Sequence, residues 1–343
     1  MTSKLSRLLK HICVAALTIQ GLMLSQTIRA QSLHSVEQES FNSPQEAVNV
    51  LVTAAESNDK DSLHAIFGPA GRQLVSPDAV QAAQSYKMFV QRLTQNIEMV
   101  TNSEDNISLL IGNDYWPFPI PLIRHDGQWV FDTEAGSQEI LARRIGMDEL
   151  GALDVCRAYM QAQRDYASQD RTGKGILAYA QFLHSDPGTH DGLYWPVKSG
   201  EPLSPLGPLV ASAHGEGYHH TAQMLNQQAA PYHGYYFRVL TRQGAHAPGG
   251  AYSYVINGNM IAGFALVAWP AEWGNTGVMT FIVNQQGKIY EADLGPNTGK
   301  YAAEMKAFNP DPRWWRPAGS DQKVAPFNGT VVFGHFLNFR LRL

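Results

Sequence analysis

The sequence predicts an α+β protein of two domains, one covering residues 43–146 and the other residues 147–316. Amphipathic helical segments precede short strand segments in the first part, and a helix followed by strands recurs in the second. Turn signals such as Asp126-Gly127 and Asn257-Gly258 separate successive strands, as in antiparallel hairpins. A chain of about 300 residues usually forms two domains rather than one.

The first 30 residues have the order of a cleavable secretory signal. Three basic residues precede an apolar stretch from Ile12 to Leu24, and Ile28-Arg29-Ala30 fits a small-residue cleavage pattern. The apolar stretch has about 13 residues, fewer than the roughly 20 that a membrane-spanning helix needs. We therefore expect export to the periplasm or the exterior, with a mature chain that begins near Gln31.

The charge of the chain restricts its partners. Lys and Arg total 26 against 30 Asp and Glu, which gives a formal net charge of −4. Cleavage of the signal removes four basic residues and no acidic ones, so the mature charge is about −8. We expect no nucleic-acid partner, because a negative protein is repelled by polyanions. Stable membrane insertion after cleavage is not expected either. An envelope protein or polymer is one partner that export would allow.

Helices open the first domain. Residues 31–42 are polar and aperiodic, which is typical of a linker. Ser43-Pro44 begins a helix in which Ser43 can cap the amides and Glu46 can complete a capping box. Helical periodicity returns at residues 63–67, before Gly68-Pro69, and again at residues 80–93.

Strands complete this domain. The segments 97–100 and 107–111 are followed by a hairpin that turns at Asp126-Gly127. Residues 116–121 (WPFPIP) hold three prolines, which lack amide donors, so we expect a rigid edge or loop and not a central strand. Helices on a curved antiparallel sheet in this order resemble the cone-shaped nuclear-transport-factor-two-like fold.

The second domain begins with helices. Residues 139–145 predict a short helix that ends at Gly146, where we place the domain boundary, and Asp148 can cap the next helix. Residues 185–216 are rich in Gly, Pro and Ser, which predicts an irregular loop. Strands are predicted at residues 235–241, 251–256, 260–269, 278–283 and 288–292, before a short helix at residues 301–308. A helix followed by a four-stranded antiparallel sheet resembles the soluble head of type IV pilins, although here the helix is internal.

The single mature cysteine and the C-terminal tail give two further expectations. Cys156 lies on an apolar helical stripe, so we expect a buried and inert thiol. Residues 317–343 form an apolar tail, in which Phe339 and Leu341 alternate with Arg340 and Arg342. This is a half-buried strand pattern. The tail either adds an edge strand to the second domain or extends loosely and pairs with another chain, and we favour weak docking on the body of the protein.

Motifs of known chemistry are missing from the sequence. It holds no phosphate-binding glycine loop, no nucleophile elbow and no zinc-protease motif, so we expect no cofactor and no metal. The densest polar segment, residues 214–220, contains three histidines at spacings that fit no metal site. We expect the His233 ring to bond a backbone carbonyl and fix the turn before a strand. Glu272 beside Trp273 suits a sugar-binding acid next to an aromatic platform, although a surface loop that covers a sheet edge is the favoured interpretation. The candidate binding residues are Trp195, His233, Tyr235, Trp269, Glu272 and Trp273.

Five motifs together resemble a bacterial exported family catalogued as domain of unknown function 2950. They occupy residues 116–121, 140–146, 191–196, 231–238 and 263–270. The resemblance runs in order from about Ser43 to Trp314 and implies an exported bacterial protein without a known activity. Members of that family often carry an acidic, glycine-rich loop that resembles a calcium site. Here residues 170–175 hold one carboxylate beside two cations, so we interpret them as a plain turn.

These observations favour an exported, soluble binding module without enzymatic activity. Its aromatic-rich loops would bind an envelope partner, a peptide or a polymer. The alternative is a hydrolase acting on an envelope polymer, with Glu272 or His233 in its active site.

Overall fold

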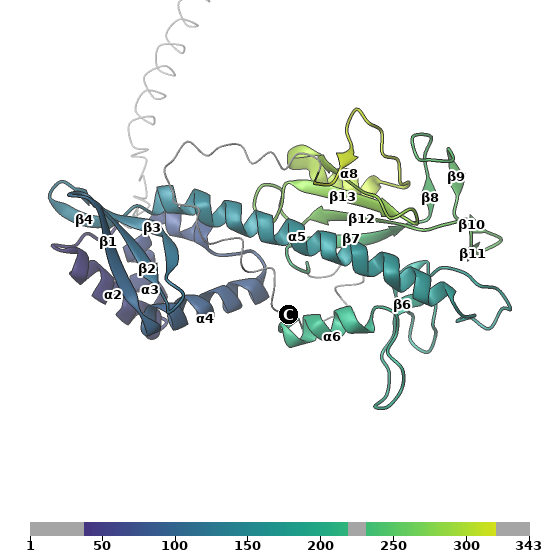
Figure 1. The fold of residues 1–343 in the computed structure, drawn as a ribbon, viewed down its shortest axis with the longest axis horizontal. Helices are drawn as coiled ribbons and strands as arrows, with labels where there is room; N and C mark the ends of the chain where they lie inside the picture. Colours follow the sequence, from purple (N-terminus) through teal and green to yellow (C-terminus); the bar gives the residue numbers. More distant parts are fainter. Residues whose placement is uncertain (1–37, 219–230, 320–343) are drawn as a thin grey trace, which may run out of the picture.

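A computed structural model describes residues 38–218 and 231–319 of the chain. These residues form an elongated molecule in which one long helix joins two lobes (Figure 1). Both lobes combine helices with an antiparallel sheet, which confirms the predicted α+β class. The signal segment, His219, His220 and the tail from residue 320 onward lie outside the described residues.

The first lobe begins with helical segments, of which the α-helices are capped by side chains at their N-termini. These segments are α2 (Pro44–Glu56), α3 (Lys60–Phe67), the 3-10 turn η1 (Pro69–Leu74) and α4 (Ala79–Gln95). The Ser43 hydroxyl accepts the Glu46 amide at 3.1 Å, as predicted. The Glu46 carboxylate accepts the Asn42 amide at 2.9 Å, so the reciprocal bond lies one residue before the predicted cap.

A four-stranded antiparallel sheet follows in chain order. It comprises β1 (Ile97–Ser103), β2 (Asn106–Ile111), β3 (Trp116–His125) and β4 (Gln128–Phe131). The proline-rich segment forms the first half of β3, and it is an edge there, as predicted, although β3 as a whole lies between β2 and β4. Residues 116–118 pair with β2 alone, whereas β4 pairs only with residues 122–125. The prolines are tolerated because their half of β3 has a neighbour on one side only.

The last residues of the predicted linker belong to this lobe. Phe41 is only 2% exposed and sits in the core of the first lobe. Its amide donates to the Trp129 carbonyl at 2.8 Å, and the Trp129 amide donates back at 2.7 Å. Residues 38–42 therefore cover the outer edge of β4, and the linker prediction is wrong for them.

Helix α5 (Thr133–Ala167) is 35 residues long and continues through the predicted boundary at Gly146. Its first half packs on β3 and η1, and its second half packs on the sheet of the other lobe. A glycine inside a helix costs only about 1 kcal/mol relative to alanine, which packing at both ends of α5 outweighs. Asp148, predicted as a helix cap, lies within α5.

The second lobe contains a five-stranded antiparallel sheet, one strand more than predicted. Its order is β15 (Arg316–Pro317), β14 (Ile289–Asp293), β13 (Met279–Asn284), β12 (Ala265–Pro270) and β7 (Tyr235–Leu240). Helix α5 covers one face of this sheet. On the other face lies α8 (Thr298–Glu304), where Arg238 donates to the carbonyls of Ala302 and Met305. This last helix begins and ends earlier than the predicted 301–308.

Shorter elements complete the second lobe. They are β5 (Phe182–His184), β6 (Gly192–Tyr194), α6 (Gly207–Gly215), β8 (Arg242–Gln243), β9 (Tyr252–Ser253), β10 (Val255–Ile256), β11 (Asn259–Met260) and η2 (Gly295–Asn297). The segment 185–216, predicted to be irregular, contains α6, because Val210 and Ala213 are buried on one helical face. The predicted hairpin at Asn257-Gly258 is present, but its strands have only two residues each.

Two separate hydrophobic cores lie on either side of residue 146. One is built from residues 41–131 and the other from residues 152–308. Cys156 lies in the second core and is fully buried, as predicted, and this burial raises the pKa of its thiol to about 12. Within the described ranges, no helix is long and apolar enough to cross a membrane.

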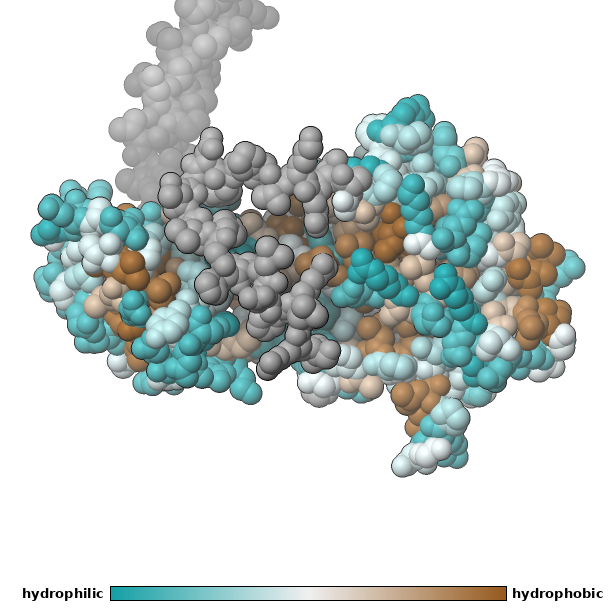
Figure 2. Space-filling model, viewed as in Figure 1, coloured by the Kyte–Doolittle hydropathy of each residue, from teal (hydrophilic) through white to brown (hydrophobic). Residues whose placement is uncertain are grey.

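The outer end of the second lobe carries an exposed apolar patch, visible at the right of Figure 2. The amide of Tyr179 donates to the carbonyl of Met260 at 2.8 Å, which brings residues 176–182 beside residues 255–261. Neither segment contains a charged side chain. Exposed apolar patches of this kind often mark interaction surfaces. The exposed side chains are Ile176, Leu177, Phe182, Ile256 and Ile261.

Candidate functional site

A cluster of polar side chains fills the junction between the two lobes. It combines the start of α4, the middle of α5 and two segments of the second lobe. We call it the junction cluster, and it consists of Asp78, Gln81, Arg144, Asp148, Glu216, Tyr218 and His233. Two of the five sequence motifs described above, residues 140–146 and 231–238, contribute to it.

Asp148 is the most deeply buried carboxylate of the junction cluster, with 1% of its surface exposed. One carboxylate oxygen accepts the Gln81 amide at 2.6 Å, and Oδ2 has no hydrogen-bond partner. Burial raises the pKa of Asp148 to about 7, although the Gln81 bond opposes this shift. The group therefore changes charge near neutral pH, unlike an ordinary carboxylate.

Arg144 lies one helical turn before Asp148 and is 6% exposed. Its Nη2 donates to the carbonyl of Gln73 at 3.1 Å, while Nε and Nη1 have no partner. Burial lowers the pKa of Arg144, and the charges of Asp148 and Glu272 partly offset this effect. The guanidinium is thus held near two carboxylates, with two of its nitrogens left unpaired.

A tight turn at His233-Gly234 closes over α5. Gly234 has φ +70°, and a β-carbon added there would lie 2.6 Å from Oδ2 of Asp148 and 2.7 Å from Cβ of Thr276. His233 has φ +46°, and its Nε2 lies 2.8 Å from Oε2 of Glu216. We expected the ring of His233 to fix this turn, and its partner is a carboxylate.

The start of α4 is tied to the second lobe by hydrogen bonds. Asp78 caps α4 with Oδ1, and its Oδ2 accepts the Tyr218 hydroxyl at 2.7 Å. Burial raises the pKa of Tyr218, so its hydroxyl remains a donor. The side chain of Gln84 donates to the carbonyl of Glu216. These bonds connect residues on opposite sides of the junction.

A loop at residues 271–278, in which Glu272 and Trp273 are exposed, lies against the junction cluster, and we call it the outer loop. The indole nitrogen of Trp273 donates to Oδ1 of Asp293 at 2.8 Å, and 38% of the residue is exposed. Asn275 donates to the Glu272 carboxylate at 2.8 Å. The end of the loop is fixed by Glu149, which accepts the amides of Val278 and Met279 at 3.0 Å. The indole is therefore exposed but held in one orientation.

The structure brings only part of the predicted site together. His233 belongs to the junction cluster, and Glu272 and Trp273 lie in the outer loop beside it. Tyr235 is fully buried and donates to the Met279 carbonyl at 2.8 Å, so it is a core residue. Trp269 is half-buried, with its ring 5.8 Å from that of Tyr236.

Trp195 lies at a different end of the second lobe. Its ring is 6.5 Å from that of Tyr166, and Tyr166 lies about 27 Å along α5 from Asp148. His190 stacks on Trp195 at 4.3 Å, and the Arg171 guanidinium lies 5.7 Å from the ring centre. Trp195 is therefore engaged within the chain and does not join the outer loop.

Sequence reasoning missed the two central residues of the junction cluster. Arg144 and Asp148 are spaced four residues apart, which on an exposed helix is an ordinary charge pair. The apolar residues nearest to this pair in the sequence, Met147 and Leu150, lie on a different face of the helix, so the sequence did not indicate that Arg144 and Asp148 are buried. In the structure these apolar residues are exposed, at 65% and 52%, and the charged pair is buried. Contacts between the two lobes bury the charged pair and leave the two apolar residues exposed.

Among residues 38–218 and 231–319, no group of three or more His, Cys, Asp or Glu side chains could hold a metal ion. Both carboxylate oxygens of Asp170 accept donors of the following turn, including the Gly175 amide at 2.6 Å. Residues 170–175 therefore form a turn closed by the chain's own donors.

Comparisons with known proteins define the family. Neither the curated proteins nor the solved structures contain a match, so the likeness to pilin heads and to the nuclear-transport-factor-two-like fold remains a resemblance. The model of a family described as "Protein of unknown function (DUF2950)" matches residues 38–316. This match covers more than half of the chain and both lobes. The chain therefore belongs to the DUF2950 family, as its motifs predicted.

Proposed function

We propose that the chain is an exported binding module without catalytic activity, and that its outer loop recognises a polyhydroxylated envelope polymer. Export is supported by the order of basic, apolar and small residues in positions 1–30. Binding is supported by the geometry of Trp273 and its neighbours.

The fixed, exposed indole of Trp273 is the observation that carries this proposal. Its bond to Asp293 holds the ring in place before any ligand arrives, so little side-chain entropy is lost on binding. Aromatic rings offer an apolar face on which a sugar ring can stack. The neighbouring carboxylate of Glu272 is exposed and could accept hydroxyl groups. A glycan is the ligand class that uses both features.

The burial of the junction cluster argues against catalysis there. Asp148 and Arg144 are 1% and 6% exposed, so a polymer has no direct access to them. Two cavities among the described residues lie elsewhere, one under α6 and one in the first lobe. An active site for glycoside hydrolysis needs two carboxylates that reach the same glycosidic bond. A buried Asp148 does not meet this requirement.

One observation favours the hydrolase alternative. The pKa of Asp148, about 7, suits a general acid that works near neutral pH. That function would require the lobes to separate so that Asp148 and Glu272 both face the substrate. The alternative therefore makes a distinct prediction, which is the release of soluble product.

Co-sedimentation with isolated cell-wall polymer tests both functions. The chain should sediment with the polymer, and Trp273→Ala should weaken this binding at least tenfold because the stacking face is lost. Trp314→Ala removes an indole that is 71% exposed outside the outer loop and should bind like the unchanged chain. Equal binding by Trp273→Ala would exclude the outer loop as the site. Release of soluble fragments, lost in Asp148→Asn, would establish the hydrolase instead.

A further inference from the structure

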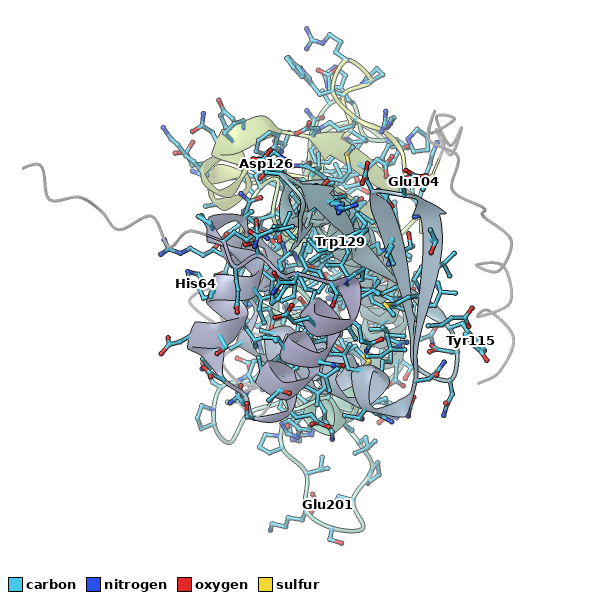
Figure 3. All side chains as sticks on the ribbon, turned by 90° about the vertical axis from the view of Figure 1, so that its left-hand side faces the viewer. His64, Glu104, Tyr115, Asp126, Trp129 and Glu201 are labelled. Carbon is cyan, nitrogen blue, oxygen red and sulfur yellow. The ribbon has the colours of Figure 1, made fainter. Side chains whose placement is uncertain are left out.

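One edge of the first sheet is covered by another segment of the chain, and the opposite edge is open among the described residues. The outer edge of β4 is covered by Phe41, which exchanges two backbone hydrogen bonds with Trp129. The outer edge of β1 has no partner strand among the described residues. Figure 3 shows the β1–β2 side of this lobe, with Glu104 and Tyr115 near its two ends. An open edge of seven residues can accept an added strand.

A groove of about 450 Å³ runs beside this open edge. It lies between α2 and β1 and ends at the last turn of α4. Ile97 and Met99 face the groove, because they pair with the core residues Ile111 and Leu109 on the same side of the sheet. Met99 is 38% exposed although it points to the helical side, so the helices leave this strip uncovered. The volume falls in the range of ligand sites.

The groove and its edge carry negative charge. Glu56 is the only ionisable side chain that lines the groove, and Glu98 lies in β1 itself. A suitable strand would therefore place apolar side chains in the groove and basic side chains on its opposite face, close to Glu98. Pairing of two copies through β1 is disfavoured, because it would bring like charges together.

The sequence of this chain ends in such a segment. Residues 339–343 read FRLRL, in which three apolar residues alternate with Arg340 and Arg342. Position 339 lies 20 positions beyond Gly319, the last described residue, and an extended chain of that length spans up to about 70 Å. This reach exceeds the length of α5, about 52 Å at 1.5 Å per residue. The segment is therefore long enough to reach the first lobe of its own molecule.

We propose that the groove beside β1 binds residues 339–343 of the same chain as an added strand. Backbone groups would pair with the open edge, and the apolar side chains would enter the groove over Ile97 and Met99. The two arginines would lie on the opposite face of the added strand, near Glu98. The groove belongs to the first lobe, so the proposal is independent of glycan binding by the outer loop.

A labelled peptide with the sequence of residues 331–343 tests the proposal by fluorescence anisotropy. The full chain lacking residues 331–343 should bind it at least tenfold more tightly than the intact chain, whose own segment competes. Glu56→Lys with Glu98→Lys should weaken peptide binding at least tenfold in the shortened chain. Glu104→Lys, in the β1–β2 turn, is the matched control and should leave binding unchanged. Equal binding by the shortened and intact chains, or no effect of the double variant, would overturn the proposal.

A cross-linking experiment keeps the proposal testable if the shortened chain does not fold. Thr53→Cys, in the lining of the groove, and Leu343→Cys are combined with Cys13→Ser in the full chain. Mild oxidation should give an intramolecular disulfide, which leaves a monomer of altered mobility on a non-reducing gel. Glu104→Cys replaces Thr53→Cys in the control, which should cross-link at least tenfold less. A cross-linked dimer would show that the segment binds a neighbouring copy, and no preferential cross-link would exclude the groove. Either result overturns the proposal.

Discussion

Oδ2 of Asp148 faces Gly234 so closely that a β-carbon on this glycine would lie 2.6 Å from it. The contact joins the middle of α5 to the turn that precedes β7. It also explains why the carboxyl is shielded from water, since the backbone of the turn lies directly over it. The conformation of the turn and the protonation of Asp148 are therefore linked.

Gly234→Ala should lower the free energy of unfolding by about 2–4 kcal/mol. Part of this loss comes from φ +70°, which costs an L-residue roughly 1–2 kcal/mol. The rest comes from the clash with Asp148 and Thr276. Gly250→Ala is the matched control, because Gly250 has φ +74° and nothing lies within 4 Å of its added β-carbon. Denaturant titration should show a clearly larger loss for Gly234→Ala, and equal losses would contradict the contact.

The stability of the protein should fall as the pH rises from about 4 to about 7. The pKa of Asp148 is raised from 3.8 to about 7 in the folded chain, so the folded state retains a proton that the unfolded state releases in this window. Stability decreases with pH wherever the folded state binds more protons. The total change is on the order of 4 kcal/mol, because each unit of pKa corresponds to about 1.4 kcal/mol.

Asp148→Asn should remove this part of the pH dependence. The amide carries no charge at any pH, and its oxygen can still accept from Gln81. The variant should therefore be more stable than the unchanged chain at pH 8 and similar to it near pH 4. Asp154→Asn changes an exposed carboxylate of the same helix and should leave the pH profile intact. Parallel profiles for Asp148→Asn and the unchanged chain would show that another group titrates.

The sequence predicted most elements because local signals marked them. Asp126-Gly127 and Asn257-Gly258 adopt positive φ at both residues, as two-residue hairpin turns require. Ser43 begins α2 with a side-chain cap, as predicted. These features depend on a few adjacent residues, so they can be read without knowledge of tertiary structure.

The errors share one physical cause, which is contact between distant segments. Gly146 was predicted to end a helix because the residues next to it in the sequence do not reveal that both lobes pack on α5. Phe41 looked like part of a linker because its partner, Trp129, is 88 residues away. Arg144 and Asp148 looked solvated for the same reason. The junction cluster consists almost wholly of such contacts, so it could not be predicted from local patterns.

Export should remove the first 30 residues. Mass spectrometry of the envelope fraction is expected to find a mature N-terminus near Gln31, because Ala30 ends a small-residue cleavage pattern. Replacement of Ala30 by a bulky residue should slow this processing. An intact N-terminus retained in membranes would contradict the prediction.

Cys156 should react with a thiol reagent only when the protein unfolds. Its side chain is fully buried, and a pKa of about 12 keeps it protonated at neutral pH. The labelling rate under native conditions should therefore be far below the rate in denaturant. Fast labelling of the native protein would show that the second core opens readily.

The first lobe should fold without the second, provided that Phe41 is retained. All its fully buried apolar residues lie between positions 41 and 131, and Gly136 of α5 packs directly against Ile120. A fragment of residues 38–146 should therefore melt cooperatively. A fragment of residues 43–146 lacks Phe41, whose ring packs edge-on against Phe131 at 6.3 Å, and loses the cover of the β4 edge.

Loss of a buried phenylalanine costs about 3–5 kcal/mol, which approaches the whole stability of a small domain. The shorter fragment should therefore melt at a much lower temperature or stay unfolded, and circular dichroism would distinguish the two fragments. Phe41→Leu in the longer fragment is the intermediate case, because it keeps both backbone bonds to Trp129 and removes only part of the ring contact. If the fragment of residues 38–146 is itself unfolded while the full chain is stable, the junction cluster must hold the first lobe together. The two lobes would then be one cooperative unit, joined through Asp78, Asp148 and Tyr218.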